Sequence, residues 1–181
     1  MRRLVLLLLL SFGIATHANG QTTVGVHYSA LANEYPDETL SGVGAFATFS
    51  RRLFGVEAAT TFFPSADTGE RAWQLLAGPR VGVTWRDVAL YGRVRPGFVR
   101  FSERFYKPEV VCIAIFPPPE ACLASRTSLQ LDLGGTVEVG VTPSAVLRLD
   151  LGDTLTRYNQ EPLAARWTHG LQFTAGVGWK F

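Results

Sequence analysis

Apolar and polar residues alternate along eight segments of this sequence, and this alternation limits the fold more than any other feature. From Leu171 to Phe181 every second residue is apolar, and the residues between are small or polar. Successive side chains of a β-strand point to opposite faces, so a period of two predicts a strand with one apolar face. The pattern predicts strands at 22–31, 40–50, 53–63, 72–85, 88–101, 128–141, 145–157 and 167–181.

The connections between these strands alternate in length. Tight turns at 51–52, 86–87 and 142–144 alternate with longer connections, of which residues 102–127 form the longest. This order describes an up-and-down meander with every long loop at one end. Transmembrane barrels of the bacterial outer membrane have short periplasmic turns and longer extracellular loops. We therefore predict an all-β chain that folds as an eight-stranded antiparallel up-and-down transmembrane β-barrel.

The charges decide which face of each strand points outward. The predicted polar faces carry Lys180 and eight further charged residues, whereas the apolar faces are almost without charge over about ten residues each, enough for a tilted membrane strand. A soluble barrel with its apolar face inward would carry far more charge on its exterior. The eight are predicted to form a charge network in the barrel interior, as a structural plug or, alternatively, a narrow conducting path: Glu57, Arg80, Arg93, Arg95, Asp132, Glu138, Arg148 and Asp150.

Four tryptophans lie on the predicted apolar faces. Trp73 and Trp85 share one strand, Trp167 and Trp179 share another, and both pairs are twelve residues apart. Twelve residues of a tilted strand rise roughly 30 Å, which is the thickness of the hydrocarbon layer. We therefore predict an aromatic girdle with one ring of each pair at each membrane interface.

The N-terminal segment indicates export. A basic MRR is followed by the short apolar run LVLLLLLSFGIA and by small residues suited to cleavage after Ala18 or Gly20. The apolar run is too short to span a bilayer as a helix. We predict a signal peptide at residues 1–20 and a barrel domain at residues 21–181.

Composition and motifs argue against several function classes. The formal net charge is +2 and the basic residues form no stripe or tail, so nucleic-acid binding is not predicted. The sequence has no phosphate-binding loop, dinucleotide fingerprint, zinc spacing or EF-hand loop, and we predict no cofactor and no metal. His27 is expected to point inward, and His169 lacks a serine two residues later. We predict a protein that is not an enzyme, with a lipid A-modifying enzyme as an alternative.

The long connection 102–127 is the predicted contact region. It contains Phe105, Tyr106 and Phe116 together with prolines, and exposed apolar surface of this kind often marks binding. Cys112 and Cys122 lie within the same connection, and an even, close pair in an exported chain predicts a disulfide. Two free thiols are the alternative.

The sequence resembles the small eight-stranded outer-membrane barrels of the OmpA transmembrane-domain and OmpX type. The resemblance rests on the signal segment, the strand count, GVGAFATFSRRLFGVEAATTFFP at 42–64 and the final GVGWKF. It implies that Phe181 and Trp179 form an assembly signal read by the outer-membrane barrel assembly machinery. It also implies residence among the lipids of a Gram-negative-type outer membrane. The expected role is structural, or an extracellular contact made through residues 102–127, rather than catalysis.

Overall fold

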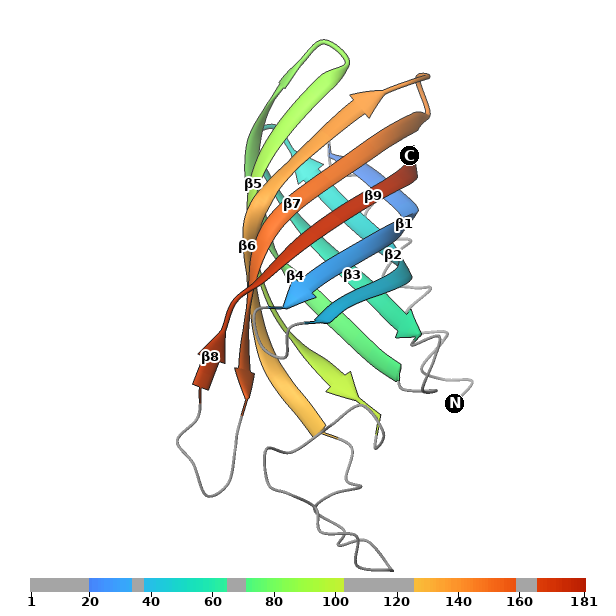
Figure 1. Ribbon diagram of the computed structural model, residues 1–181. Coiled ribbons are helices and arrows are strands. Elements are labelled where there is room, and N and C mark those ends of the chain that lie inside the picture. The colour runs from blue at the N-terminus through green and yellow to red at the C-terminus, as the bar shows by residue number, and fades with distance from the viewer. Residues whose placement is uncertain (1–19, 34–37, 65–70, 103–125, 159–165) are drawn as a thin grey trace, which may run out of the picture.

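The computed structural model describes residues 20–33, 38–64, 71–102, 126–158 and 166–181, and these residues form one closed antiparallel barrel (Figure 1). Each strand from β1 to β7 pairs with the next one in the chain, β9 also pairs with β7, and β9 closes the barrel against β1. The strands are β1 (Gln21–Asn33), β2 (Glu38–Arg51), β3 (Phe54–Pro64), β4 (Arg71–Trp85), β5 (Val88–Phe101), β6 (Arg126–Gly140), β7 (Ala145–Tyr158), β8 (Arg166–Thr168) and β9 (Gly170–Lys180).

The prediction of eight antiparallel strands is confirmed, with one correction in the last of them. The segment expected as a single strand at 167–181 is interrupted at His169 into β8 and β9. Both parts pair with β7, but only β9 also pairs with β1, and its first residue, Gly170, lies opposite Asn33 at the end of β1. The interruption therefore falls where the strand loses its second neighbour.

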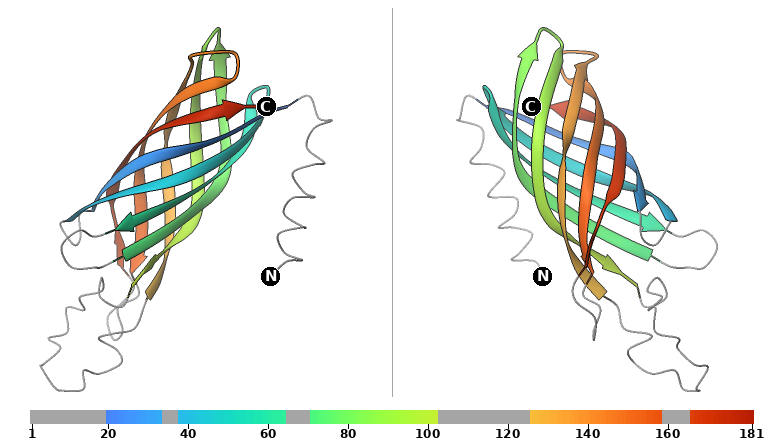
Figure 2. Two further views of the ribbon diagram at one scale, coloured as in Figure 1. Left: turned by 90° about the vertical axis from the view of Figure 1, so that its right-hand side faces the viewer. Right: turned by 60° about the vertical axis from the view of Figure 1, so that its left-hand side comes forward.

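The two ends of the barrel differ. The tight turns β2–β3, β4–β5 and β6–β7 gather at one end, where residue 181 also lies (Figures 1 and 2). At the other end the strands are joined by residues 34–37, 65–70, 103–125 and 159–165, which lie outside the described residues. We call the two ends the turn end and the loop end.

The strand register fixes the tilt of the barrel. Followed once round the barrel, the pairing that starts at Gln21 returns to β1 at Leu31, a shift of ten residues. For eight strands spaced about 4.8 Å apart, this shift corresponds to a tilt of roughly 40°. A barrel of this size has an interior that side chains can fill completely.

The two faces of the wall have opposite character. Leu147, Leu149 and Leu151 of β7 point outward and are each about half exposed, whereas Arg148 and Asp150 between them are buried. The outward faces of the other strands are likewise apolar. The prediction that the apolar faces form the exterior is confirmed. Among the described residues, no helix is long and apolar enough to cross a membrane.

Candidate functional site: the barrel interior

The eight charged residues predicted from the sequence come together inside the barrel. They lie on five neighbouring strands, β3 to β7, and all point inward because an alternating pattern turns every second residue inward. All are buried, with exposed fractions of 5 % or less. Four arginines face four carboxylates, so their formal charges cancel: Arg80, Arg93, Arg95 and Arg148 against Glu57, Asp132, Glu138 and Asp150.

Glu57 of β3 is the centre of this layer. Its carboxylate lies 2.9 Å from Arg148 Nη2 and 3.1 Å from Arg95 Nη1. Arg80 Nη1 and Arg93 Nε both lie 3.8 Å from the same carboxylate. One acid thus contacts all four arginines, so its charge is shared by the whole layer.

The other carboxylates each bind a subset of the arginines. Asp132 accepts from Arg93 Nε at 3.0 Å and from Arg95 Nε at 2.9 Å. Arg148 Nε donates to Asp150, whose carboxylate also accepts from Arg93 Nη1. Glu138, the fourth acid, accepts from Arg80 Nη1 at 2.6 Å. Charge-assisted bonds of this kind are the strongest hydrogen bonds in proteins, and here they link the strands β3 to β7.

Three atoms of the layer lack a well-directed hydrogen bond: Glu57 Oε1, Arg93 Nη2 and Arg148 Nη1. For Glu57 Oε1 the ion-pair distance and the hydrogen-bond angles disagree, because Arg95 Nη1 is only 3.1 Å away. The two groups still form an ion pair, because the attraction between buried charges depends little on the angle. The layer is neutral overall and electrostatically paired, although not every donor is used.

Two aromatic rings complete the charged layer. The Cζ atom of Arg80 lies 4.0 Å from the centre of the Tyr91 ring, and that of Arg148 lies 4.7 Å from the centre of the Phe46 ring. A guanidinium over an aromatic face gains electrostatic attraction and covers its apolar surface. These contacts hold the two arginines against the wall from which the rings project.

A second layer, of amides and hydroxyls, lies on the loop-end side of the charges. Gln74 and Gln172 exchange hydrogen bonds, and Gln74 Nε2 also donates to Gln130 Oε1 at 2.9 Å. Gln172 donates to Ser29 Oγ at 2.9 Å and accepts from Thr154 Oγ1 at 2.9 Å. The amide orientations follow from this network. The role of these glutamines was missed by the sequence reasoning, although their shared inward parity was the available signal.

A third layer is apolar and lies nearest the loop end. It is one buried cluster on the strands β1 to β5: Leu31, Leu40, Phe63, Ala72, Val99 and Phe101. The sequence analysis expected polar residues on the inward faces, so this cluster departs from the expectation. The physical reason is packing, because side chains that meet only each other inside a narrow barrel need no polarity. Leu76 of β4, an apolar residue at an inward position of its strand, is likewise buried inside the barrel.

Two contacts show that the interior is spanned from wall to wall. The strands β3 and β7 are four apart in the closed order of eight, and so are β4 and β9, so each pair lies on opposite walls. Glu57 of β3 nevertheless bonds Arg148 of β7 at 2.9 Å, and Gln74 of β4 bonds Gln172 of β9 at 3.0 Å. Opposite walls are therefore joined directly by side chains at two depths.

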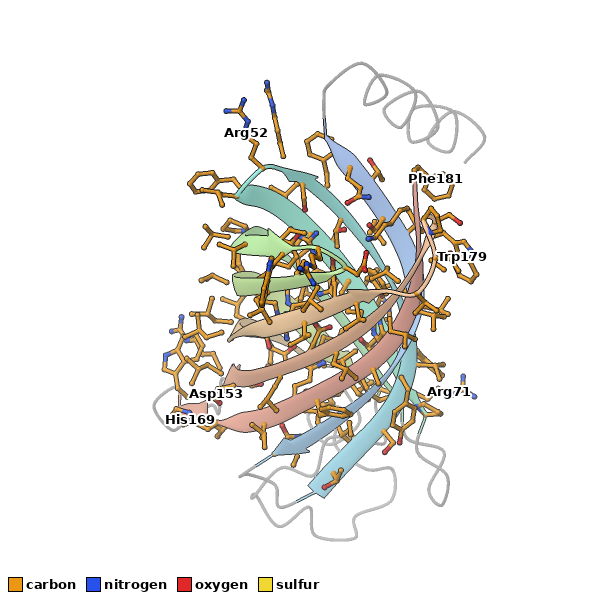
Figure 3. All side chains as sticks on the ribbon, turned by 90° about the horizontal axis from the view of Figure 1, so that it is seen from above. Arg52, Arg71, Asp153, His169, Trp179 and Phe181 are labelled. Carbon is orange, nitrogen blue, oxygen red and sulfur yellow. The ribbon has the colours of Figure 1, made fainter. Side chains whose placement is uncertain are left out.

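The two histidines among the described residues lie in different surroundings. His27 Nε2 is inside the barrel, 3.0 Å from Thr61 Oγ1, and its ring stacks near that of Phe46. His169 is on the outside at the β8–β9 interruption, where Nδ1 lies 2.8 Å from an oxygen of Asp153 (Figure 3). Asp153, which interrupts the apolar face of β7, thus has an exposed partner, and β7 keeps an unbroken register through it.

The remaining predicted residues fall in two groups. The four tryptophans are all exposed on the outside, with Trp85 and Trp179 near the turn end and Trp73 and Trp167 near the loop end. Phe181 is 80 % exposed, and its backbone N–H donates to Thr22 O at 2.8 Å, which ties it to β1. The others, including residues 1–19, lie outside the described residues: Phe105, Tyr106, Cys112, Phe116 and Cys122.

Comparison with known proteins shows similarity in structure without similarity in sequence. No protein-family model matches the chain, and neither does any curated protein. Among solved structures, Neisserial surface protein A is 15 % identical with a TM-score of 0.55, covering 90 % of this chain and 97 % of its own. The N-terminal β-barrel domain of Pseudomonas aeruginosa OprF is 12 % identical with a TM-score of 0.51, covering 90 % and 100 %.

A third similar structure is Ail, the attachment invasion locus protein of Yersinia pestis, in complex with the heparin analogue sucrose octasulfate. It is 18 % identical with a TM-score of 0.50, and the match covers 90 % of this chain and 97 % of Ail. At these identities the similarity establishes the fold alone. The barrel described above, with its closed order of strands and its apolar exterior, has the fold of the small eight-stranded outer-membrane β-barrels.

Proposed function

We propose that this chain is an integral outer-membrane barrel of a Gram-negative-type bacterium, without enzymatic activity, whose lumen is a structural plug. The observation that carries the plug is the pair of wall-to-wall contacts Glu57–Arg148 and Gln74–Gln172. A pore needs a continuous path of water, and both contacts occupy the centre of the lumen at different depths. The buried apolar cluster at the loop end fills further space inside the barrel along β1 to β5.

The exterior supports membrane residence. Apolar side chains cover the outside of every strand, and in a β-barrel all backbone groups along the closed wall can pair without water. Exposed apolar surface of this extent is unfavourable in water. A lipid environment removes that cost, which is why we place the chain among outer-membrane lipids, inserted by the barrel assembly machinery.

With a closed lumen, biological contacts are left to the loop end. We propose that residues 102–127 bind an extracellular ligand or surface, with Phe105, Tyr106 and Phe116 as contact residues and a Cys112–Cys122 disulfide as a local constraint. Ail, which has the same fold, is known in complex with a heparin analogue, so this scaffold supports ligand binding in at least one protein. The ligand of the present chain is not implied by that example.

The test is a binding comparison on cells. Cells that display the intact protein are compared with cells that display a variant lacking residues 104–124, against extracellular matrix, glycosaminoglycan and host-cell surfaces. Heat-modifiable migration of both proteins in outer-membrane fractions shows that both barrels are folded. We expect binding by the intact protein alone, and equal binding by the two would contradict the proposal.

A further inference from the structure

Two arginines at the turn end have an unfavourable backbone conformation. Arg52 and Arg86 are each the first of two residues in a tight turn, and each has a φ of 54°. For a residue with a side chain, the population of this left-handed region is about fivefold or more below the population of its usual conformations. Arg52 and Arg86 are the non-glycine residues that do so among the described part of the chain.

Glycine is the usual choice for this position. In the two-residue turns that join antiparallel strands, the first residue with positive φ is most often glycine, because glycine has no Cβ to clash. Both turns of this kind at one end of the barrel carry arginine instead. A strained residue that persists at two equivalent places indicates that the side chain itself is needed there.

The surroundings of the two arginines are basic. Arg51, Arg52 and Arg86 are all exposed, and the one acidic side chain described on these turns is the exposed Asp87. The β6–β7 turn, residues 141–144, carries no charge. The described turns thus present a net charge of +2 (three arginines less one aspartate) to whatever surrounds the turn end.

Each arginine also has an exposed aromatic neighbour. Phe54, two residues after Arg52 at the start of β3, is 70 % exposed, and Trp85, directly before Arg86, is 77 % exposed. The Cζ atom of Arg86 lies 5.9 Å from the centre of the Trp85 ring. In Figure 3 the Arg52 side chain points away from the barrel wall. An aromatic ring beside a long basic side chain matches the boundary between hydrocarbon and headgroups.

We propose that Arg52 and Arg86 bind the phosphate groups of phospholipids in the leaflet at the turn end. This inference rests on the membrane residence proposed above. A guanidinium binds phosphate oxygens through two parallel hydrogen bonds, a geometry that other side chains do not provide. The anionic phosphate is complementary to the charge of the turns, and its depth is set by the neighbouring aromatic rings. Binding lipid at this boundary is the need that keeps arginine where glycine would cost less.

The experiment compares the double variant Arg52→Gly/Arg86→Gly with the natural protein in two environments. In phosphate-free maltoside micelles the variant should have a folding equilibrium constant about twentyfold higher, because both turns lose their strain. In phosphatidylglycerol vesicles each arginine should raise the folding equilibrium constant of the natural protein about fivefold, because its charge is attracted to the anionic surface. The advantage of the variant should therefore shrink to threefold or less. Urea unfolding followed by tryptophan fluorescence gives both constants.

A matched control separates strain from charge. Arg51→Gly removes an identical charge one residue earlier, from a strand position without positive φ, so it should show no gain in micelles. Arg52→Lys/Arg86→Lys keeps the charge and the strain, so it should stay close to the natural protein in micelles and respond to phosphatidylglycerol more weakly, because lysine binds phosphate through one point charge.

Three results would overturn the proposal. One is a double glycine variant that is no more stable than the natural protein in micelles, and another is an advantage that persists in full in phosphatidylglycerol. The third is inorganic phosphate in micelles removing the advantage as well as the lipid does, which would identify a soluble anion as the ligand. Heat-modifiable migration is measured first in both environments, so a failure of membrane insertion is recognised separately.

Discussion

Replacing Val26 by arginine tests the assignment of the outer face in a place where the magnitude can be derived from the structure. Val26 lies near the middle of β1, points outward and is 55 % exposed. Its partners on the two neighbouring strands are Ala45 and Val177, so no carboxylate lies opposite. An arginine on the lipid face near the midplane destabilises an outer-membrane barrel by about 2–4 kcal/mol. We expect a loss of stability in this range for Val26→Arg.

The matched substitution is Leu133→Arg. Leu133 also points outward from the middle of its strand, but its partner on β7 is Asp153. An arginine at 133 can pair with that carboxylate, which should recover up to about 1 kcal/mol. Asp153 already contacts His169, so the recovery comes from sharing an existing pair. In an Asp153→Asn background the recovery should disappear.

Both free energies come from reversible urea unfolding in neutral phospholipid vesicles, with Val26→Leu as the control for a change of shape alone. The control should stay within about 1 kcal/mol of the natural protein, because it preserves the apolar surface. An unchanged stability of Val26→Arg would refute the outward assignment of β1. Equal costs for Val26→Arg and Leu133→Arg would refute the pairing with Asp153.

Three further predictions concern the interior, assembly and the long loop. Glu57→Gln leaves four arginines facing three acids and should destabilise the barrel by about 3–5 kcal/mol in urea unfolding; a change below about 1 kcal/mol would show that the charges are not coupled. Phe181→Asp should lower outer-membrane insertion while export continues, which fractionation and heat-modifiability report; normal amounts of folded barrel would contradict this. Cys112→Ser with Cys122→Ser should leave the barrel intact and increase protease cleavage within 103–125; failed assembly would show that the constraint is not local.

The strands and the charged layer could be predicted because both depend on parity, that is, on whether a residue has an odd or an even position along its strand. A period of two places Glu57, Arg148 and Asp150 on inward faces regardless of which strands become neighbours, and the count of strands follows from the number of alternating segments. The narrow lumen then brings charges from different strands within reach. The predicted strand ends agree with the structure within two residues.

Other features depend on information that parity does not contain. The inward direction of Leu31 and Phe63 is predictable, but their contact with each other depends on the shift between strands, which no local pattern reports. The partners of Gln172 lie up to 143 positions away in the chain for the same reason. The left-handed turns at Arg52 and Arg86 were missed because the usual glycine signal is absent there.

The closed lumen is the central claim, and single-channel recording in planar bilayers tests it most directly. The natural protein should insert without reproducible conductance steps, because Glu57–Arg148 and Gln74–Gln172 join opposite walls at two depths. A variant with Glu57, Arg148, Gln74 and Gln172 all replaced by glycine lacks both contacts and serves as the open reference, provided it still shows heat-modifiable folding. We predict no reproducible conductance steps from the natural protein and reproducible steps from this variant. Reproducible steps from the natural protein would contradict the plug.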